Sequence, residues 1–505
     1  MLPSSTPEYS PETPTNAHYR PLPLPPQATS PLVLIEGFLS CTSEYFWGDF
    51  ETHLNAHRAE VGSKKRRHII FARVSPVNSV HDRACELFYS LKGGTVDYGE
   101  DHSIQNGHSR YGRHHSTGLY PSWSAKHPLH FLGHSMGGVT IVKMMSMIRD
   151  GFFGPDAHPD MVATLNCVGS PFRGTQIGYW ITGSFTTAPK FAPISISTLV
   201  SWYLHLMSYL SPILPSAIVP DFHNEARNLT MKDMSFLDLL RQLCCSDWSE
   251  GKDAIPWDCT FQAGEDRDLE WESSRGMGGR TWYRSYVNSW TELSNPQEPF
   301  HTPKKFSMTP MWLLSWIMGG FDFHRIKPLP KFLADRLSIS EDEDFNTLDD
   351  PEGGILVSSE TSSEVDSLAD GNSMPVLLDE NHFANDGMVP SFSQWHPGNC
   401  NDSSCTHYAP LVDTARLPHS HLREKSILKP GVWNVITVEN SHHFSLMPLW
   451  FGTHQQHTFW YGLGEWLEEV DAVRSLLSLH DAIPKMDALK MEAKLRMRVV
   501  PNAYQ

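Results

Sequence analysis

The chain has 505 residues, of which 40% are hydrophobic, and its 57 acidic and 40 basic side chains give a formal net charge of -17. This length can bury one large core and also allows two or three domains. The acidic excess argues against nucleic acid as a partner, because a phosphate backbone would be repelled.

Four apolar runs predict buried strands at residues 32–35, 68–74, 129–132 and 162–168. Residues 82–91 and 139–148 have helical spacing, whereas residues 93–113 are polar and histidine-bearing and predict an ordered loop. Strands that alternate with helices in this way indicate a parallel sheet with helices on both faces. In such sheets an active site gathers at the carboxyl ends of the strands.

Residues 191–220 carry no charged side chain and allow three interpretations. Their polar side chains fall at spacings of four, four and three, which makes one thin polar stripe on a helix: Ser197, Ser201, His205 and Ser208. Such a helix is either buried in the core or a lid over a lipid site, and the stripe disfavours the third interpretation, a membrane span. A second apolar stretch, residues 311–318, either faces the same site or packs in the core.

The outer parts of the chain differ in composition from its centre. Residues 1–30 are rich in proline, lack the apolar core of a secretory signal and predict a disordered leader. Residues 338–372 are acidic and serine-rich and predict a disordered insertion. Residues 432–438 predict the last strand, residues 458–477 a closing helix, and residues 471–505 a helical tail. One main domain, residues 31–470, therefore carries most of the core.

The eight cysteines contain no C-x-x-C pair. Free, mostly buried thiols in a reducing compartment are the expected arrangement for a chain of this length, with a Cys400–Cys405 disulfide as the alternative. Together with the missing signal, this predicts an intracellular protein that is not transmembrane.

The sequence from Gly133 to Gly137 has the pattern G-x-S-x-G between a predicted strand and a predicted helix. This is the pattern of a nucleophile elbow, in which a tight turn holds Ser135 above the sheet. A serine nucleophile needs a histidine base and an acidic partner later in the chain, and His443 and Asp386 fit that order. The backbone N–H groups of Phe38 and Met136 are the natural oxyanion donors.

A longer pattern resembles the true lipases of the staphylococcal and thermoalkalophilic bacillus type. It consists of Asp82-Arg83-Ala84-Cys85-Glu86, residues 93–99, His102, His108 and residues 110–113. The resemblance extends from about residue 31 to residue 467, and includes Asn385-Asp386-Gly387 and residues 429–434. It implies an α/β-hydrolase fold with a helical lid or cap at residues 176–235, and the activity of a triacylglycerol lipase.

The resemblance also implies roles for individual residues. The family's nucleophile falls on Ser135, its acid on Asp386 and its oxyanion donors on Phe38 and Met136. Its histidine falls on His443, with the neighbouring His442 as the competitor. These roles describe a serine carboxylic-ester hydrolase that works through an acyl-enzyme.

A structural zinc site is implied as well, with Asp82, His102 and His108 matching three of the family's four ligands. The best alignment places Asn228 at the fourth position, and Asp233 or a water molecule is the alternative. We expect no calcium where the family has a glutamate after the catalytic histidine, because Ser445 stands there, and we expect no organic cofactor.

Two other functions use the same residues or the same fold. The acyl-enzyme would also serve a phospholipase or an acyltransferase. A non-catalytic lipid-binding homologue is favoured only by Glu36, which places a negative charge where the family has a histidine beside the oxyanion. Lipids or esters are the expected ligands, with reversible contact to a droplet or membrane surface.

Overall fold

The structure is a computed structural model that describes most of the chain. The described residues are 29–39, 44–60, 62–63, 65–185, 192, 194–215, 218–274, 279–304, 306, 309–333, 378–400, 403–411 and 429–498. The chain forms two compact units, Thr29–Asp471 and a second that joins Met1–Ala28 to Ala472–Gln505. The predicted leader up to residue 28, the predicted acidic insertion 338–372 and the end of the predicted tail, residues 499–505, lie outside the described residues.

Seven parallel strands form the main sheet, in the order β10-β11-β7-β6-β5-β1-β2. Their bounds are β1 Leu32–Ile35, β2 Ile69–Phe71, β5 Leu129–His134, β6 Val162–Val168, β7 Trp282–Ser289, β10 Cys405–Leu411 and β11 Trp433–Glu439. Two antiparallel pairs stand apart from it: β3 Gly94–Asp97 with β4 Tyr111–His115, and β8 Thr291–Asn295 with β9 Glu298–Pro303. The predicted parallel sheet is confirmed, but residues 93–113 are not a plain loop, because they contain the β3–β4 pair and a short helix.

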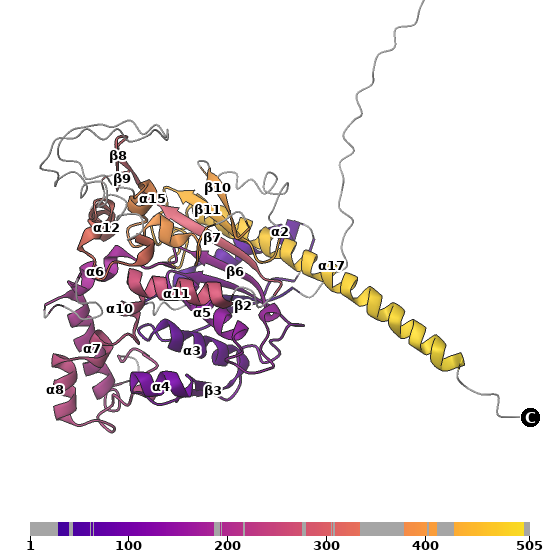
Figure 1. The fold of residues 1–505 in the computed structure, drawn as a ribbon, viewed down its shortest axis with the longest axis horizontal. Coiled ribbons are helices and arrows are strands. Elements are labelled where there is room, and N and C mark those ends of the chain that lie inside the picture. The colour runs from indigo at the N-terminus through magenta and orange to yellow at the C-terminus, as the bar shows by residue number, and fades with distance from the viewer. Residues whose placement is uncertain are drawn as a thin grey trace, which may run out of the picture. The chain divides into compact units, whose positions relative to one another are not determined.

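Helices cover both faces of the sheet (Figure 1). The longer ones are α3 Val80–Lys92, α5 Met136–Arg149, α7 Ile196–Leu210, α8 Phe236–Cys244, α11 Phe261–Ser274, α12 Pro310–Gly319 and α17 His454–Arg498. The shorter ones are α1 Phe50–Leu54, α2 Ala56–Glu60, α4 Glu100–Asn106, α6 Gln176–Thr182, α9 Asp247–Glu250, α10 Ile255–Asp258 and α15 Glu380–Phe383. Single 3-10 turns occur at η1 Glu44–Trp47, η2 Pro159–Met161, η3 Glu225–Arg227, η4 Phe323–Arg325 and η6 Ser391–Gln394.

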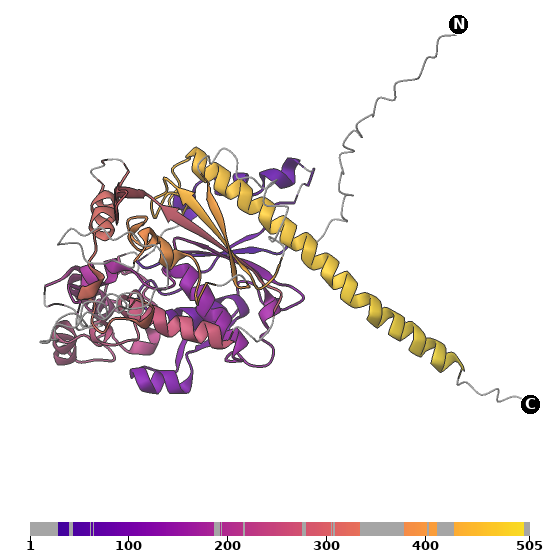
Figure 2. The ribbon, with the colours of Figure 1, turned by 45° about the horizontal axis from the view of Figure 1, so that its top comes forward.

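Neighbouring residues of β5 show how the two faces are filled, because side chains alternate along a strand. Phe131 is fully buried in the cluster that also contains residues of α3 and α5. His130 points to the other face, where its Nε2 lies 3.0 Å from Asp471 Oδ1 of α17. The first part of α17 runs across the strands on that face (Figure 2), and Trp466 there donates to Asn166 of β6 over 3.1 Å.

The turn between β5 and α5 is as tight as the glycine pattern predicts. Ser135 has φ 54° and ψ -128°, a strained conformation for a residue with a side chain. A Cβ atom on Gly133 would lie 2.4 Å from the backbone N of Gly138, and one on Gly137 would lie 2.3 Å from the carbonyl O of Ile35. Backbone atoms cannot move aside as a flexible side chain can, so both positions require glycine.

Gly133→Ala is therefore expected to lower the free energy of unfolding by about 3 kcal/mol or more, through overpacking against backbone. The midpoint of urea unfolding measures this loss. Gly320→Ala is the matched control, because a Cβ there has no heavy atom within 4 Å and φ is -121°. An equal midpoint for the two variants would contradict the tight turn.

Helix α7 carries the predicted polar stripe, but its orientation excludes a core helix. Ser197, Ser201, His205 and Ser208 are buried, whereas the apolar side chains on the opposite face, Leu199, Trp202, Tyr203 and Leu206, are 41–62% exposed. No helix in the described part of the chain is long and apolar enough to cross a membrane. The predicted lid, whose apolar face would close over a lipid site, stays a prediction, because that face is exposed here.

Helix α12 has a similar character. Ser315 and Met318 are buried, while Leu313 and Trp316 are exposed, so core packing does not account for its apolar residues. Helices α6, α7, α8 and α12 gather on one side of the main unit (Figure 1), where α6 contacts both α7 and α12. This side therefore presents apolar side chains from several helices to solvent.

Candidate active site and metal-ligand clusters

Ser135 lies where β5 ends and α5 begins, at the carboxyl edge of the sheet. Met136 is the first residue of α5, and the N–H groups of a first helical turn have no partner within the helix. The turn after β1 passes close by, because a Cβ atom on Gly37 would lie 3.2 Å from Ser135 Oγ. Phe38 follows Gly37 directly. Both candidate oxyanion donors therefore lie beside the candidate nucleophile.

Asp386 and His443 form a buried pair in which His443 Nδ1 lies 2.8 Å from Asp386 Oδ2. The other carboxylate oxygen, Oδ1, accepts hydrogen bonds from the backbone N–H groups of Met388 and Val389 at 2.9 and 2.8 Å. Gly169, after β6, makes room for the pair, since a Cβ there would lie 3.2 Å from both interacting atoms.

His443 lies next to the elbow. Its carbonyl oxygen accepts a hydrogen bond from Nε2 of His134, the residue before Ser135, over 2.9 Å. Burial, with a smaller contribution from His443, lowers the pKa of His134 to about 3, so this ring is neutral. The competing His442 has another role, because its Nδ1 accepts from the backbone N–H of Phe444 and closes the turn.

The turn that carries Phe38 is held by a buried cation. Arg83 of α3 donates through Nη2 to the carbonyl oxygen of Glu36 at 2.6 Å and through Nε to Thr140 Oγ1 of α5 at 2.9 Å. Burial lowers its pKa to about 10, which still leaves it charged at neutral pH. The Glu36 carboxylate accepts a hydrogen bond from Trp47 Nε1 at 2.9 Å.

A candidate metal cluster contains none of the proposed triad residues. It consists of Asp82, His102, His108 and Asp253, whose ligand atoms all lie within 4.8 Å of one another. His102 Nε2 lies 3.2 Å from both Asp82 Oδ1 and Asp253 Oδ1, and His108 Nε2 lies 3.4 Å from Asp253 Oδ2. Three of the four residues are those expected from the sequence.

The expected fourth position was wrong. Asn228 donates to Ser109 Oγ at 3.4 Å and Asp233 accepts from Thr230 Oγ1 at 2.6 Å, so neither belongs to the cluster. The segment around Asn228 does reach the cluster, but through the neighbouring Arg227. Its Nη2 lies 2.7 Å from Asp82 Oδ2 and 2.6 Å from Asp253 Oδ2.

The electrostatics of the cluster suit a cation. Burial lowers the pKa of His102, but hydrogen bonds with Asp253 and Asp82 outweigh burial and raise it to about 9. The pKa of Asp253 is lowered, since its hydrogen bonds with His102 and His108 and the charge of Arg227 outweigh burial. His108 Nε2 and Asp253 Oδ1 are buried, and their contacts are with Asp253 Oδ2 at 3.4 Å and His102 Nε2 at 3.2 Å, within the cluster itself. Two carboxylates and two imidazoles so close together fit a zinc ion.

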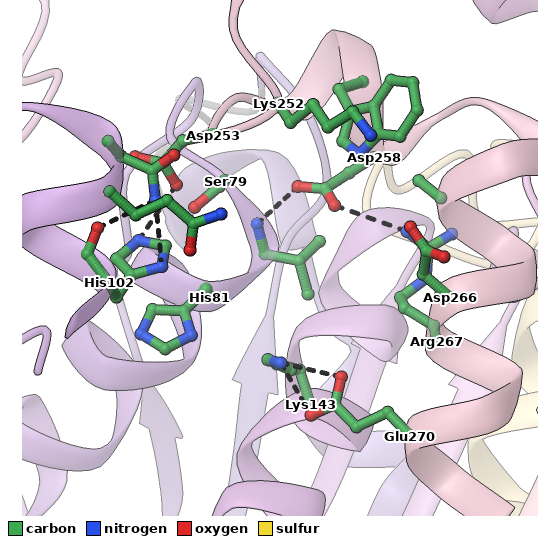
Figure 3. Close-up of a pocket in the computed structure, with 15 residues that line it drawn as sticks. Ser79, His81, His102, Lys143, Lys252, Asp253, Asp258, Asp266, Arg267 and Glu270 are labelled. Atoms are coloured by element: carbon green, nitrogen blue, oxygen red, sulfur yellow. Dashed lines mark hydrogen bonds and ion pairs between the residues drawn. The ribbon is translucent and has the colours of Figure 1, made fainter.

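A cavity of about 360 Å³ opens beside this cluster (Figure 3). His81 lies there with its ring stacked on that of His102, the centroids being 3.7 Å apart. Burial, together with the charge of His102, lowers the pKa of His81 to about 4. On the far wall, Lys143 Nζ pairs with Glu270 Oε1 at 2.6 Å. The cavity lining includes none of Ser135, Asp386 and His443.

A second group of metal-ligand side chains was not expected from the sequence. It consists of His396, Cys400, Cys405 and His407, between η6 and the start of β10. No disulfide joins Cys400 and Cys405, so that predicted alternative is not realised. The signal that could have revealed this group is the H-x₃-C-x₄-C-x-H spacing.

The comparisons with known proteins point to lipases. Residues 28–182 match the family model for a lipase-like, C-terminal domain. A lipase of Staphylococcus hyicus is 34% identical over 173 residues, which are 30% of this chain and 26% of that protein. The N-terminal part of the chain is thus similar in sequence to staphylococcal lipases. This match spans about a quarter of the curated relative's length.

Solved structures extend the likeness in fold to most of the chain. The crystal structure of Staphylococcus hyicus lipase covers 89% of this chain and 98% of its own, with a TM-score of 0.58 and 20% identity. EstA from Clostridium botulinum covers 87% of both chains, with a TM-score of 0.53 and 20% identity. The chain therefore has the α/β-hydrolase fold predicted from its sequence.

Proposed function

We propose that the protein is a serine carboxylic-ester hydrolase whose substrates are acylglycerols. The observation that carries this proposal is the buried Asp386–His443 pair beside the strained elbow at Ser135. The lipase relatives support the choice of acylglycerols as substrate class. The proposal includes the roles of Ser135 as nucleophile, His443 as base and Asp386 as the acidic partner of the base.

The proposed chemistry follows from the hydrogen bonds around His443. Asp386 Oδ2 can only accept, so the proton of the neutral imidazole lies on Nδ1, and Nε2 is left to take the proton of the Ser135 hydroxyl. Ser135 Oγ then attacks the ester carbonyl, and the N–H groups of Phe38 and Met136 stabilise the oxyanion. Collapse releases the alcohol, and a water molecule activated by His443 hydrolyses the acyl-enzyme.

Covalent labelling tests the proposal directly. Wild-type protein treated with a fluorophosphonate in the presence of detergent should gain one adduct by intact mass spectrometry. His443→Ala should stay unlabelled, whereas His442→Ala should label like wild type. If folded wild-type protein gains no adduct, the proposal is contradicted and a non-catalytic lipid-binding function is favoured.

The exposed apolar face of α7 is the proposed contact with the lipid surface. Its side chains are held outward, since the polar face is the one that packs against the body through His205 and Ser208. Transfer of such side chains from water into lipid is favourable in proportion to the apolar area that is covered.

The double variant Leu199→Ser with Leu206→Ser is expected to bind phosphatidylcholine vesicles roughly tenfold more weakly, since it loses about 1–2 kcal/mol of apolar burial. Turnover of an emulsified triacylglycerol should fall in parallel, while turnover of a dissolved short-chain ester should not. Leu269→Ser on α11, also highly exposed, is the control. Equal losses on emulsified and dissolved substrates would contradict a surface-binding role.

We also propose that Asp82, His102, His108 and Asp253 hold a structural zinc ion. Asp82 lies on α3, His102 on α4 with His108 just after it, and Asp253 just before α10. The ion would therefore connect three separate segments of the chain. Its contribution is to stability, because neutral imidazole and carboxylate complete a closed tetrahedral site.

Asp253→Ala is expected to lower the zinc content by one equivalent per chain and to weaken zinc binding by roughly 100-fold or more. Metal analysis and the midpoint of thermal unfolding with and without chelator measure this. Asp233→Ala is the control and should keep wild-type zinc. The opposite pattern, with zinc lost from the Asp233 variant alone, would refute the assignment.

A further inference from the structure

Four side chains with metal-binding chemistry meet between η6 and β10. The Sγ atom of Cys400 lies 3.1 Å from His396 Nε2 and 3.4 Å from His407 Nε2, and the ligand atoms of all four, Cys405 included, lie within 4.8 Å of one another. In a tetrahedral zinc site, with Zn–S bonds of about 2.3 Å and Zn–N bonds of about 2.0–2.1 Å, neighbouring ligand atoms are about 3.3–3.8 Å apart. The two distances from Cys400 Sγ are close to this range, and shifts of at most about 1 Å bring the other ligand atoms into it.

The tautomer of His396 is set for metal binding. Its Nδ1 lies 3.0 Å from the carbonyl oxygen of Pro397, which can only accept, so Nδ1 carries the proton. The lone pair of Nε2 therefore points at Cys400. A metal-binding histidine with its other nitrogen hydrogen-bonded to a carbonyl is the usual arrangement in proteins.

Aromatic neighbours fix the planes of both imidazole rings. His396 is 3% exposed and its ring stacks on Trp433 of β11, with the centroids 6.3 Å apart. The His407 ring packs edge-on against Trp395, with centroids 4.9 Å apart. Neither ring has to be ordered by the metal, which lowers the entropy cost of binding.

The loop that carries Cys400 is likewise held by bonds that do not involve a metal. The backbone N–H groups of Gly398 and Asn399 donate to the carboxylates of Asp268 and Glu272 on α11, at 2.8 and 2.9 Å. The carbonyl oxygen of Gly398 accepts from Arg173 Nη2 at 2.6 Å. The loop thus places Cys400 opposite Cys405, the first residue of β10, before any ion arrives.

We propose that His396, Cys400, Cys405 and His407 bind one zinc ion as a structural site separate from the Asp82 cluster. Two thiolates and two imidazoles are a donor set that structural zinc favours, and soft sulfur ligands exclude magnesium and calcium. The ion ties the loop after η6 to the edge strand β10, which pairs with β11. The ion therefore stabilises the edge strand β10, which lies in the sequence between the segments that carry Asp386 and His443.

Cobalt(II) distinguishes this site from the Asp82 cluster. Thiolate-bound cobalt gives a ligand-to-metal charge-transfer band in the near ultraviolet, and a cluster of aspartates and histidines contains no sulfur to produce one. The full chain, freed of metal and fully reduced, is titrated with cobalt and then with zinc. Because the Asp82 cluster also takes up cobalt, we expect the band to saturate by two added equivalents, with the intensity of one thiolate-bound cobalt per chain, and to disappear as zinc displaces cobalt.

Cys400→Ser and Cys405→Ser should each bind cobalt roughly 100-fold or more weakly. The double variant has neither thiolate and should lose the band. Cys244→Ser, which replaces an exposed thiol at the end of α8, is the matched control and should keep the wild-type band.

Hydrogen exchange of the unmodified chain needs no variant, and zinc is expected to slow exchange of the amides of residues 405–407 about tenfold or more. The proposal is overturned if reduced wild-type protein shows no thiolate band, or if the band survives in the double variant.

Discussion

Replacing Ser135 with alanine is expected to lower kcat for a dissolved short-chain ester by roughly a million-fold, because the residues of a triad act as a unit and fail together. The substitution removes the nucleophilic oxygen but leaves the turn intact, since alanine meets no new contact. Initial rates with a chromogenic ester measure the loss, and an unchanged thermal midpoint shows that the fold persists.

Ser273→Ala provides the control for this prediction. Ser273 is exposed on α11, where its hydroxyl donates to the carbonyl oxygen of Glu270, and its loss should leave kcat unchanged. If the Ser135 variant kept even a hundredth of wild-type activity after rigorous purification, the nucleophile would have to be another residue.

Asp386→Asn is expected to lower kcat by about 10⁴-fold, with little change in KM. The N–H groups of Met388 and Val389 both point at Oδ1, so the amide oxygen of an asparagine would take that position. Its NH₂ group would then face His443 Nδ1 and force the imidazole proton onto Nε2. That nitrogen could no longer accept the proton of Ser135.

A second aspartate–histidine pair supplies the matched control. Asp379 Oδ1 lies 2.8 Å from His382 Nδ1, as close as the atoms of the Asp386–His443 pair, and Asp379 is exposed at the start of α15. Asp379→Asn should change kcat less than twofold. A similar loss in both variants would mean that the asparagine at position 386 acts through folding and not through the tautomer.

The sequence was most informative where structure is set locally. The elbow requires glycine at two positions for steric reasons that involve only β1, β5 and α5, and the pattern from Gly133 to Gly137 records both. The strand β1 is a continuous apolar run, and β5 and β6 are mostly apolar, because all three are buried on both faces. Such features depend little on distant partners and are therefore readable from one sequence.

Strand β7 was missed because its polar residues are satisfied by distant partners. Arg284 lies in the middle of the strand, and its guanidinium is buried over the ring of Trp466 on α17, 3.7 Å from the centroid. Asn288, near the end of the strand, is also buried, and its side-chain oxygen accepts from Ser441. Nothing within the strand's own sequence indicates that these partners exist.

The same limit applies to the two metal-ligand clusters. Asp253 lies in a short connection before α10 and reaches Asp82 only through the packing of that connection against α3. Alignment favoured the segment around Asn228, which does approach the cluster but contributes the cation of Arg227 instead of a ligand. For α7, the polar stripe was predictable from the sequence, but the side of the helix that faces the protein was not.

Helix α7 rests on the body of the protein through both polar and apolar side chains. His205 Nε2 bonds to Ser246 Oγ at 2.7 Å, and Ser208 Oγ accepts from Asn224 at 2.8 Å. Leu204, in contrast, is buried in an apolar cluster with Phe222 and Trp248. Moving the helix would wet hydroxyl and imidazole groups, for which water is a good substitute partner, but it would also expose the side chain of Leu204. A lipid phase could cover that side chain as well as the apolar face that α7 already turns outward, so an oil–water boundary lowers the free-energy cost of moving the helix and plain buffer does not.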